Sequence, residues 1–168
     1  MSKKVPFETT IHVRDTCLCL HAQRAARALA RRFDEALRPV GLTNGQFSLL
    51  MSLNRPHPPS VAPVARLLAM DRTTLTAALK PLERRDLVAT EPDPKDRRSR
   101  LLRLTEKGHE ALLAALPIWR ATHAAVDAEM QEDLPEVRQG DVQAMLVALG
   151  GTGMERVSSG PREGPEAA

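Results

Sequence analysis

Aromatic residues are scarce in this sequence. They make up 2% of its 168 residues, and none of them is tyrosine. Aromatic and β-branched side chains favour strands, whereas the alanine, leucine and arginine that recur here favour helices. The length and the 42% of hydrophobic residues fit one globular unit with its own core. We therefore expect a mainly α-helical protein in which residues 1–168 form a single domain.

Long apolar runs and abundant cysteines are also missing. No stretch of about 18 apolar residues occurs, so the sequence predicts no membrane-spanning helix. The first residues lack the basic start, apolar stretch and small-residue cleavage site of a secretory signal. The two cysteines, Cys17 and Cys19, are too close together to link distant segments by a disulfide. We therefore expect a cytoplasmic protein with no membrane partner.

The sequence shows no motif of the common enzyme classes. It contains no glycine-rich phosphate-binding loop, no Gly-x-Ser-x-Gly elbow and no His-Glu-x-x-His helix. Its histidines include no pair at the four-residue spacing that places two metal ligands on one face of a helix. We predict no catalytic residue, no metal site and no cofactor.

The charge that is present is unevenly distributed. The formal net charge is only +3, but basic residues outnumber acidic ones in residues 1–108 and the reverse holds in residues 109–168. A basic region is plausible for a protein that binds a polyanion such as DNA. A solvated surface with no partner is an equally simple interpretation of the same charges.

Hydrophobic spacing and turn residues predict the order of the elements. Apolar residues that step by three or four indicate helices, and proline or glycine marks where a helix must stop. The first four helices are expected at residues 17–40, 44–53, 60–68 and 71–85. Thr43 and Gln46 have the spacing of a capping box, while Ser60 and Asp71 can cap the next two helices.

Two short strands and two more helices are expected after these. Residues 87–91 and 100–104 have the composition of strands, and the turn-rich segment between them predicts a β-hairpin with a charged tip. Thr105 opens a long helix that Pro117 should bend, and a last helix is expected at about 136–149. The tail at 150–168 is rich in glycine, serine, proline and charge, so we expect it to be mobile.

The predicted order, two short helices followed by a hairpin, is that of a winged helix-turn-helix. In that fold the second of the two helices enters the major groove of DNA. Thr73 and Thr76 are small enough to approach base edges and thymine methyl groups. Arg72, Lys80 and Arg84 can reach phosphates or guanine edges. A helix face of this kind also occurs as ordinary solvent-exposed surface.

The expected hairpin tip is strongly basic. Its cations are Lys95, Arg97, Arg98 and Arg100. Their mutual repulsion is uncompensated unless an anion binds, and phosphate is the natural one. An arginine in such a wing can enter a narrow minor groove, where the negative potential is deepest. The alternative is a disordered basic loop that binds nothing.

Four segments together resemble the MarR family of bacterial and archaeal regulators (multiple antibiotic resistance type), over about residues 16–149. They are MDRTTLT at 70–76, LKPLERRDLV at 79–88, DPKDRR at 93–98 and LTEKG at 104–108. The resemblance implies a homodimer that binds a palindromic operator in double-stranded DNA, with repression as the expected output. It places the winged helix at residues 42–104 and the dimerisation helices at 16–40 and 105–149.

The resemblance also implies roles for single residues. Arg98 is expected to insert into the minor groove, with Asp96 orienting it. Thr73, Thr76 and Lys80 are expected to read or flank the major groove. Members of the family commonly bind small aromatic or lipophilic acids between the dimer helices and the winged domain, which weakens DNA binding. Candidate lining residues for such a ligand are His21, Arg24, Phe47 and Trp119, although each has a plain core or surface role as its alternative.

Two other functions remain open from the sequence. The segment Leu18-Cys19-Leu20 resembles the one that carries the reactive cysteine of organic-hydroperoxide regulators, which suggests peroxide sensing through Cys19. Those sensors activate the thiol with tyrosines, and this chain has none. The second alternative is a winged helix that contacts only proteins. Steeply salt-dependent DNA binding would exclude it.

Overall fold

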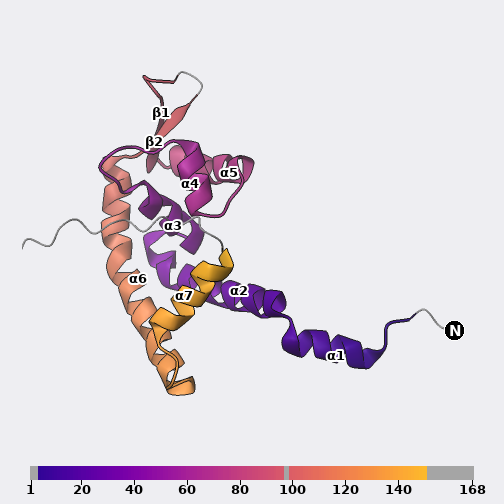
Figure 1. The fold of residues 1–168 in the computed structure, drawn as a ribbon. Coiled ribbons are helices and arrows are strands. Elements are labelled where there is room, and N and C mark those ends of the chain that lie inside the picture. The colour runs from indigo at the N-terminus through magenta and orange to yellow at the C-terminus, as the bar shows by residue number, and fades with distance from the viewer. Residues whose placement is uncertain (1–3, 97–98, 151–168) are drawn as a thin grey trace, which may run out of the picture.

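The computed structural model describes residues 4–96 and 99–150. Figure 1 shows a helical protein from which a single β-hairpin projects. The mainly α-helical fold with a two-stranded wing is confirmed. In chain order the elements are α1 (Phe7–Thr16), α2 (Leu18–Leu37), the 3-10 turn η1 (Arg38–Val40), α3 (Asn44–Leu53), α4 (Val61–Leu67), α5 (Arg72–Arg84), β1 (Val88–Pro92), β2 (Arg100–Leu104), α6 (Glu106–Asp133) and α7 (Gln139–Gly150).

The main difference from the sequence-based expectation is α1, because no helix was predicted before residue 17. Its sequence has no apolar stripe of the kind by which the other helices were recognised, and the helix buries none of its residues. Figure 1 shows it extending away from the other helices. The predicted helix at 17–40 is shorter than expected, since it gives way to η1, and Gly41 closes that turn in the left-handed conformation at φ 67°.

At the other end of the chain, the predicted tail was expected to begin at residue 150. Gly150 is instead the last residue of α7. The rest of that predicted tail, 151–168, lies outside the described residues.

The helix starts follow local chemistry at three of four predicted positions, and one of the three is Thr105, which caps α6. Thr43 and Gln46 form the expected capping box, in which each side chain bonds to the backbone amide of the other residue at 3.2 Å. Asp71 caps α5 by accepting from the Thr74 amide at 2.8 Å. Ser60 was expected to cap α4, but its side chain makes no capping hydrogen bond. Its backbone pairs with Leu101 instead, which adds a short bridge to the sheet.

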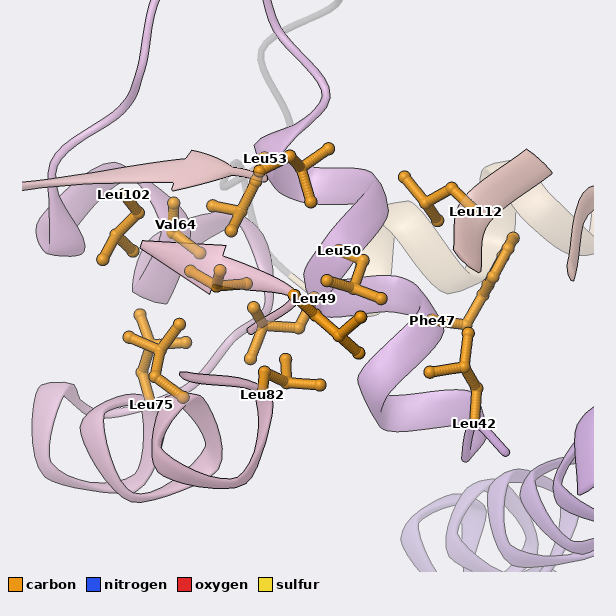
Figure 2. Packing of buried hydrophobic residues seen from close by; sticks show 14 of the residues in the cluster. Leu42, Phe47, Leu49, Leu50, Leu53, Val64, Leu75, Leu82, Leu102 and Leu112 are labelled. Atoms are coloured by element: carbon orange, nitrogen blue, oxygen red, sulfur yellow. The ribbon is translucent and has the colours of Figure 1, made fainter. Parts of the chain in front are cut away.

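One apolar core joins the winged-helix elements. Figure 2 shows leucines from α3, α5 and β2 meeting Val64 of α4 at its centre. Leu49, Leu50, Leu75, Leu82 and Leu102 are among its fully buried side chains. The two outer helices α1 and α7 contribute no buried residue to it.

The hairpin is attached at its base and exposed at its tip. The antiparallel register pairs Val88 with Leu104 and ends by pairing Pro92 with Arg100. Val88, Leu102 and Leu104 are buried in the core, whereas Pro92 and Arg100 are exposed. Figure 1 shows the described end of the hairpin pointing away from the helices, and Pro94, Lys95 and Asp96 are exposed there.

Candidate nucleic-acid interface and a neighbouring cavity

Helix α5 has one buried face and one polar face. Leu75, Leu79 and Leu82 point into the core and are at most 4% exposed. Helical periodicity turns the intervening positions outward. All five residues of α5 predicted to face DNA are exposed, namely Arg72, Thr73, Thr76, Lys80 and Arg84. Thr74, Ala77 and Glu83 are exposed as well, and Glu83 accepts a hydrogen bond from the hairpin. The exposed side chains of this helix are thus mostly hydroxyl-bearing or cationic.

The first turn of α5 is fixed by its cap. The Thr74 hydroxyl donates to one oxygen of Asp71 at 2.6 Å, and the Thr74 amide donates to the other at 2.8 Å. The side-chain hydrogen bond from Thr74, followed by the backbone one, lowers the pKa of the Asp71 carboxyl below its ordinary value. The negative charge of the carboxylate also interacts favourably with the positive end of the helix dipole. This cap holds Arg72 and Thr73 in a defined first turn.

A hydrogen bond links the hairpin to α5. The Thr90 hydroxyl of β1 donates to the Glu83 carboxylate of α5. Within the hairpin itself, Arg103 Nε lies 3.6 Å from Glu91 Oε1 across the two strands. The Thr90–Glu83 hydrogen bond adds to the shared core, so the hairpin and the exposed face of α5 keep a fixed relative position.

The tip of the hairpin is organised by its own backbone. The Lys95 amide donates to Asp93 Oδ1 at 2.8 Å, and the Asp93 amide donates to the Ser99 carbonyl at 3.1 Å. Lys95 and Arg100 are exposed there. The other two predicted cations, Arg97 and Arg98, lie outside the described residues.

A cavity of about 370 Å³ lies between α3, α4 and α6. Two of the four residues predicted to line a ligand site meet there. The rings of Phe47 and Trp119 stack with their centroids 6.0 Å apart and their planes inclined by 21°. Sequence reasoning missed the rest of the wall, because only the folded chain brings the end of α4 towards α6. These residues are Ser48, Met51, Ser52, Leu67, Leu68 and Leu116.

His21 and Arg24, the other two predicted ligand residues, do not line this cavity. Both are exposed on α2, and His21 Nε2 lies 3.3 Å from the Asp15 carbonyl. Arg24 borders a separate surface hollow together with Arg27 and Arg31. The structure therefore divides the four predicted ligand residues into an aromatic pair in the cavity and a polar pair on the surface.

The cysteines lie at the junction of α1 and α2. Cys17 has an extended backbone, with φ −74° and ψ 104°, and separates the two helices. Cys19 follows in the first turn of α2 and is exposed. Its sulfur accepts a hydrogen bond from Gln23 Nε2 at 3.2 Å.

Within residues 4–96 and 99–150, no helix is long and apolar enough to cross a membrane. The same residues contain no group of three or more His, Cys, Asp or Glu side chains able to hold a metal ion.

A helix with an exposed basic face, held beside a basic hairpin, defines a winged-helix DNA-binding protein. A family profile for the winged helix DNA-binding domain matches residues 42–108. The transcriptional regulator MosR of M. tuberculosis, solved in complex with DNA, is 36% identical, with 80% of this chain and 93% of that chain covered and a TM-score of 0.70. BadR, a transcriptional activatory protein of Rhodopseudomonas palustris, is 36% identical over 107 residues, or 61% of each chain.

A mutant MarR from E. coli, solved with operator DNA, shares the fold at 22% identity and a TM-score of 0.66, with 82% of this chain and 94% of that chain covered. The chain belongs to the MarR family of transcriptional regulators, which confirms the resemblance found in the sequence. The family consists of DNA-binding transcription regulators. The match to BadR spans less than two thirds of that protein, 61% of its length.

Proposed function

We propose that the chain is a transcriptional repressor that binds a palindromic operator in double-stranded DNA as a homodimer. We place it in the cytoplasm, where its DNA partner lies, and assign it no enzymatic activity. The observation that carries the proposal is the exposed hydroxyl-bearing and basic face of α5 opposite its buried leucines. A small molecule held in the protein modulates the binding.

The two parts of the interface have different tasks. Thr73 and Thr76 approach base edges in the major groove, where small side chains permit close contact. Arg72, Lys80 and Arg84 contact phosphates or guanine edges beside them. The hairpin supplies Lys95, Arg97, Arg98 and Arg100 for phosphate contact, with Arg98 entering the minor groove.

Footprinting on the duplex upstream of the chain's own gene tests this proposal. We expect two protomers per duplex, with guanine N7 protected in two half-sites whose centres lie about 10 base pairs apart or a multiple of that. Protection of the minor groove beside each half-site is expected to disappear in Arg98→Ala. A chain that binds no DNA even at low salt would instead be a winged helix for protein contacts.

Exposed apolar residues on the outer helices α1 and α7 are an argument for the homodimer. Met145, Leu146 and Leu149 of α7 are 58%, 53% and 65% exposed, and Phe7 of α1 is 71% exposed. An apolar helix that buries nothing within its own protomer is typical of a surface covered by a partner. A second copy is the partner that a palindromic operator requires.

We expect Leu146→Asp to convert the dimer into monomers, because it places a charge in the apolar surface that the second copy would cover. Sedimentation equilibrium measures the mass. The helix content should be unchanged, since Leu146 is exposed within the protomer. Ala144→Asp, on the same helix and also exposed but two residues from Leu146 and so on another face, is the control and should remain dimeric. A Leu146→Asp protein with the same mass as the unmodified chain would contradict the role of α7.

The ligand site is proposed at the cavity that holds Phe47 and Trp119. Its wall joins α4, the first helix of the helix-turn-helix, to the long helix α6. A ligand that prefers one separation of these helices would shift the position of α5 and thus the affinity for DNA. The sequence led us to expect an aromatic or lipophilic acid with His21 and Arg24 in its site, and those two residues lie elsewhere on α2.

Peroxide sensing through Cys19 is a second candidate function, favoured by the exposure of that thiol at the junction of two helices. If it operates, organic hydroperoxide should lower DNA affinity, and Cys19→Ser should abolish the response. Cys17→Ser tests the neighbouring thiol in the same assay. Equal responses to the peroxide in Cys19→Ser and the unmodified chain would exclude the candidate.

A further inference from the structure

We infer that the cavity between α3, α4 and α6 takes an uncharged lipophilic molecule and discriminates against acids. The inference rests on the proposed function, because it names the ligand class of the site that modulates DNA binding. It departs from the acidic ligand that the sequence led us to expect, and the reason is the chemistry of the cavity wall.

Carbon and thioether surface forms almost the whole wall. It comes from Phe47, Met51, Leu67, Leu68, Leu116 and Trp119. The only other described lining residues are Ser48 and Ser52, so no described residue of the wall is charged. The Ser52 hydroxyl donates to the Leu49 carbonyl at 2.6 Å, so its proton is already used within α3. The wall can therefore offer a ligand a hydroxyl group but no counter-charge.

Within one protomer, no described residue of the wall would compensate the charge of an acid in this cavity. A carboxylate that leaves water needs a cation or several donors in its new site, and otherwise its transfer is strongly unfavourable. Arg24, which the sequence suggested for this task, is exposed on α2 and borders the other hollow. An uncharged molecule carries no such penalty.

The size and shape of the cavity favour a compact aromatic molecule. Its volume of about 370 Å³ lies in the range of small-molecule sites, about 300–1,000 Å³. The stacked rings of Phe47 and Trp119 form a flat apolar side, against which another ring can pack in an offset or edge-on arrangement. A neutral molecule with one or two rings fits both features.

Such a ligand can also affect DNA binding. Leu67 and Leu68 close the cavity at the end of α4, and Leu116 and Trp119 close it on α6. Helix α4 packs against α5. A molecule between α4 and α6 can therefore change the position of α4 and, through it, the position of α5, the helix proposed to face DNA.

Two dyes with one skeleton test the charge preference in the full-length dimer. N-phenyl-1-naphthylamine is uncharged, and 8-anilino-1-naphthalenesulfonate is the same skeleton with a sulfonate. Trp119 is the only tryptophan of the chain and lines the cavity, so energy transfer from it to a dye reports that the dye is bound to the protein near it. We expect the uncharged dye to bind at least about tenfold more tightly than the anion, and to weaken binding to the operator duplex.

Three variants assign the binding to the cavity. Leu116→Phe fills the space and should abolish energy transfer to the uncharged dye. Leu113→Phe makes the same change on the same helix at a position that is 72% exposed, so it should leave the transfer intact. Met51→Arg places a cation at the mouth of the cavity, where Met51 is 38% exposed, and should shift the preference towards the anion.

Equal affinity for the two dyes in the unmodified protein would overturn the inference. So would an absence of energy transfer to either dye, which is expected if a segment of the second copy fills the cavity, and so would undiminished binding by Leu116→Phe. The proposed function is tested separately in the same samples. A protein that prefers the uncharged dye but binds no DNA at low salt would refute the proposed DNA-binding function. The inference that the cavity prefers uncharged molecules would still hold.

Discussion

Gly108→Ala is expected to be among the most destabilising single substitutions in this chain. Gly108 lies in the first turn of α6, and a Cβ atom there would sit 2.1 Å from the Leu87 carbonyl oxygen and 3.1 Å from its carbon. Both atoms are backbone, so no side-chain rotation relieves the clash. We expect the free energy of unfolding to fall by about 1–3 kcal/mol or more.

The clash would fall where the wing meets the long helix. The Thr105 amide donates to the same Leu87 carbonyl at 3.2 Å, and the Thr105 hydroxyl accepts from the Gly108 amide at 3.0 Å while it donates to the Asp86 carbonyl at 2.6 Å. Moving α6 away from Leu87 to admit a methyl group would lengthen these hydrogen bonds. The substitution should therefore disturb the hairpin as well as the helix start.

Chemical denaturation followed by circular dichroism measures this effect. Gly45→Ala is the matched control, because Gly45 also lies in the first turn of a helix and a Cβ there would meet nothing within 4 Å. It should be neutral or stabilising by up to about 1 kcal/mol, since alanine favours helix over glycine. Equal stability of the two variants would show that the approach of Gly108 to Leu87 is not a constraint.

Lys80→Glu is expected to have the largest effect on DNA binding among substitutions that leave the fold unchanged. Lys80 is exposed in the middle of the polar face of α5, so the change leaves the core intact. It removes a cation from the proposed contact with phosphates or guanine edges and places a carboxylate there. Loss of one contact with a guanine edge costs about 1–3 kcal/mol, and a dimer loses two, so we expect affinity to fall about thirtyfold or more.

Arg120→Glu separates this local effect from that of net charge. It makes the same change of charge at an exposed position midway along α6, away from α5. Fluorescence anisotropy with a labelled operator duplex at one fixed salt concentration compares the two proteins. We expect Arg120→Glu to bind nearly as tightly as the unmodified chain. Equal losses from both substitutions would mean that overall charge, and not the face of α5, determines the affinity.

The DNA-facing part of the fold could be predicted because its determinants are local. The leucines of α5 repeat with the helical period, and Asp71 stands where a cap must be, so the polar face follows from the sequence alone. The hairpin likewise followed from two short apolar segments around a turn. The structure agrees with the sequence on the exposure of Thr73, Thr76 and Lys80.

The features that sequence reasoning missed depend on contacts between distant segments. Nothing in the residues around Gly108 indicates that the Leu87 carbonyl approaches it, because that depends on how the wing returns to α6. The cavity wall required Leu67 and Leu116 to face each other from different helices. Helix α1 has no apolar stripe, so its sequence lacked the signal by which α2 and α5 were recognised.

The salt dependence of operator binding tests the central claim most directly. If α5 and the hairpin contact phosphates, the logarithm of the association constant should fall linearly with the logarithm of salt concentration, with a slope of about −0.9 per phosphate neutralised. Arg98→Ala should reduce the magnitude of that slope by about one for each copy in the complex. Absence of binding at low salt, or binding that salt does not weaken, would contradict the account.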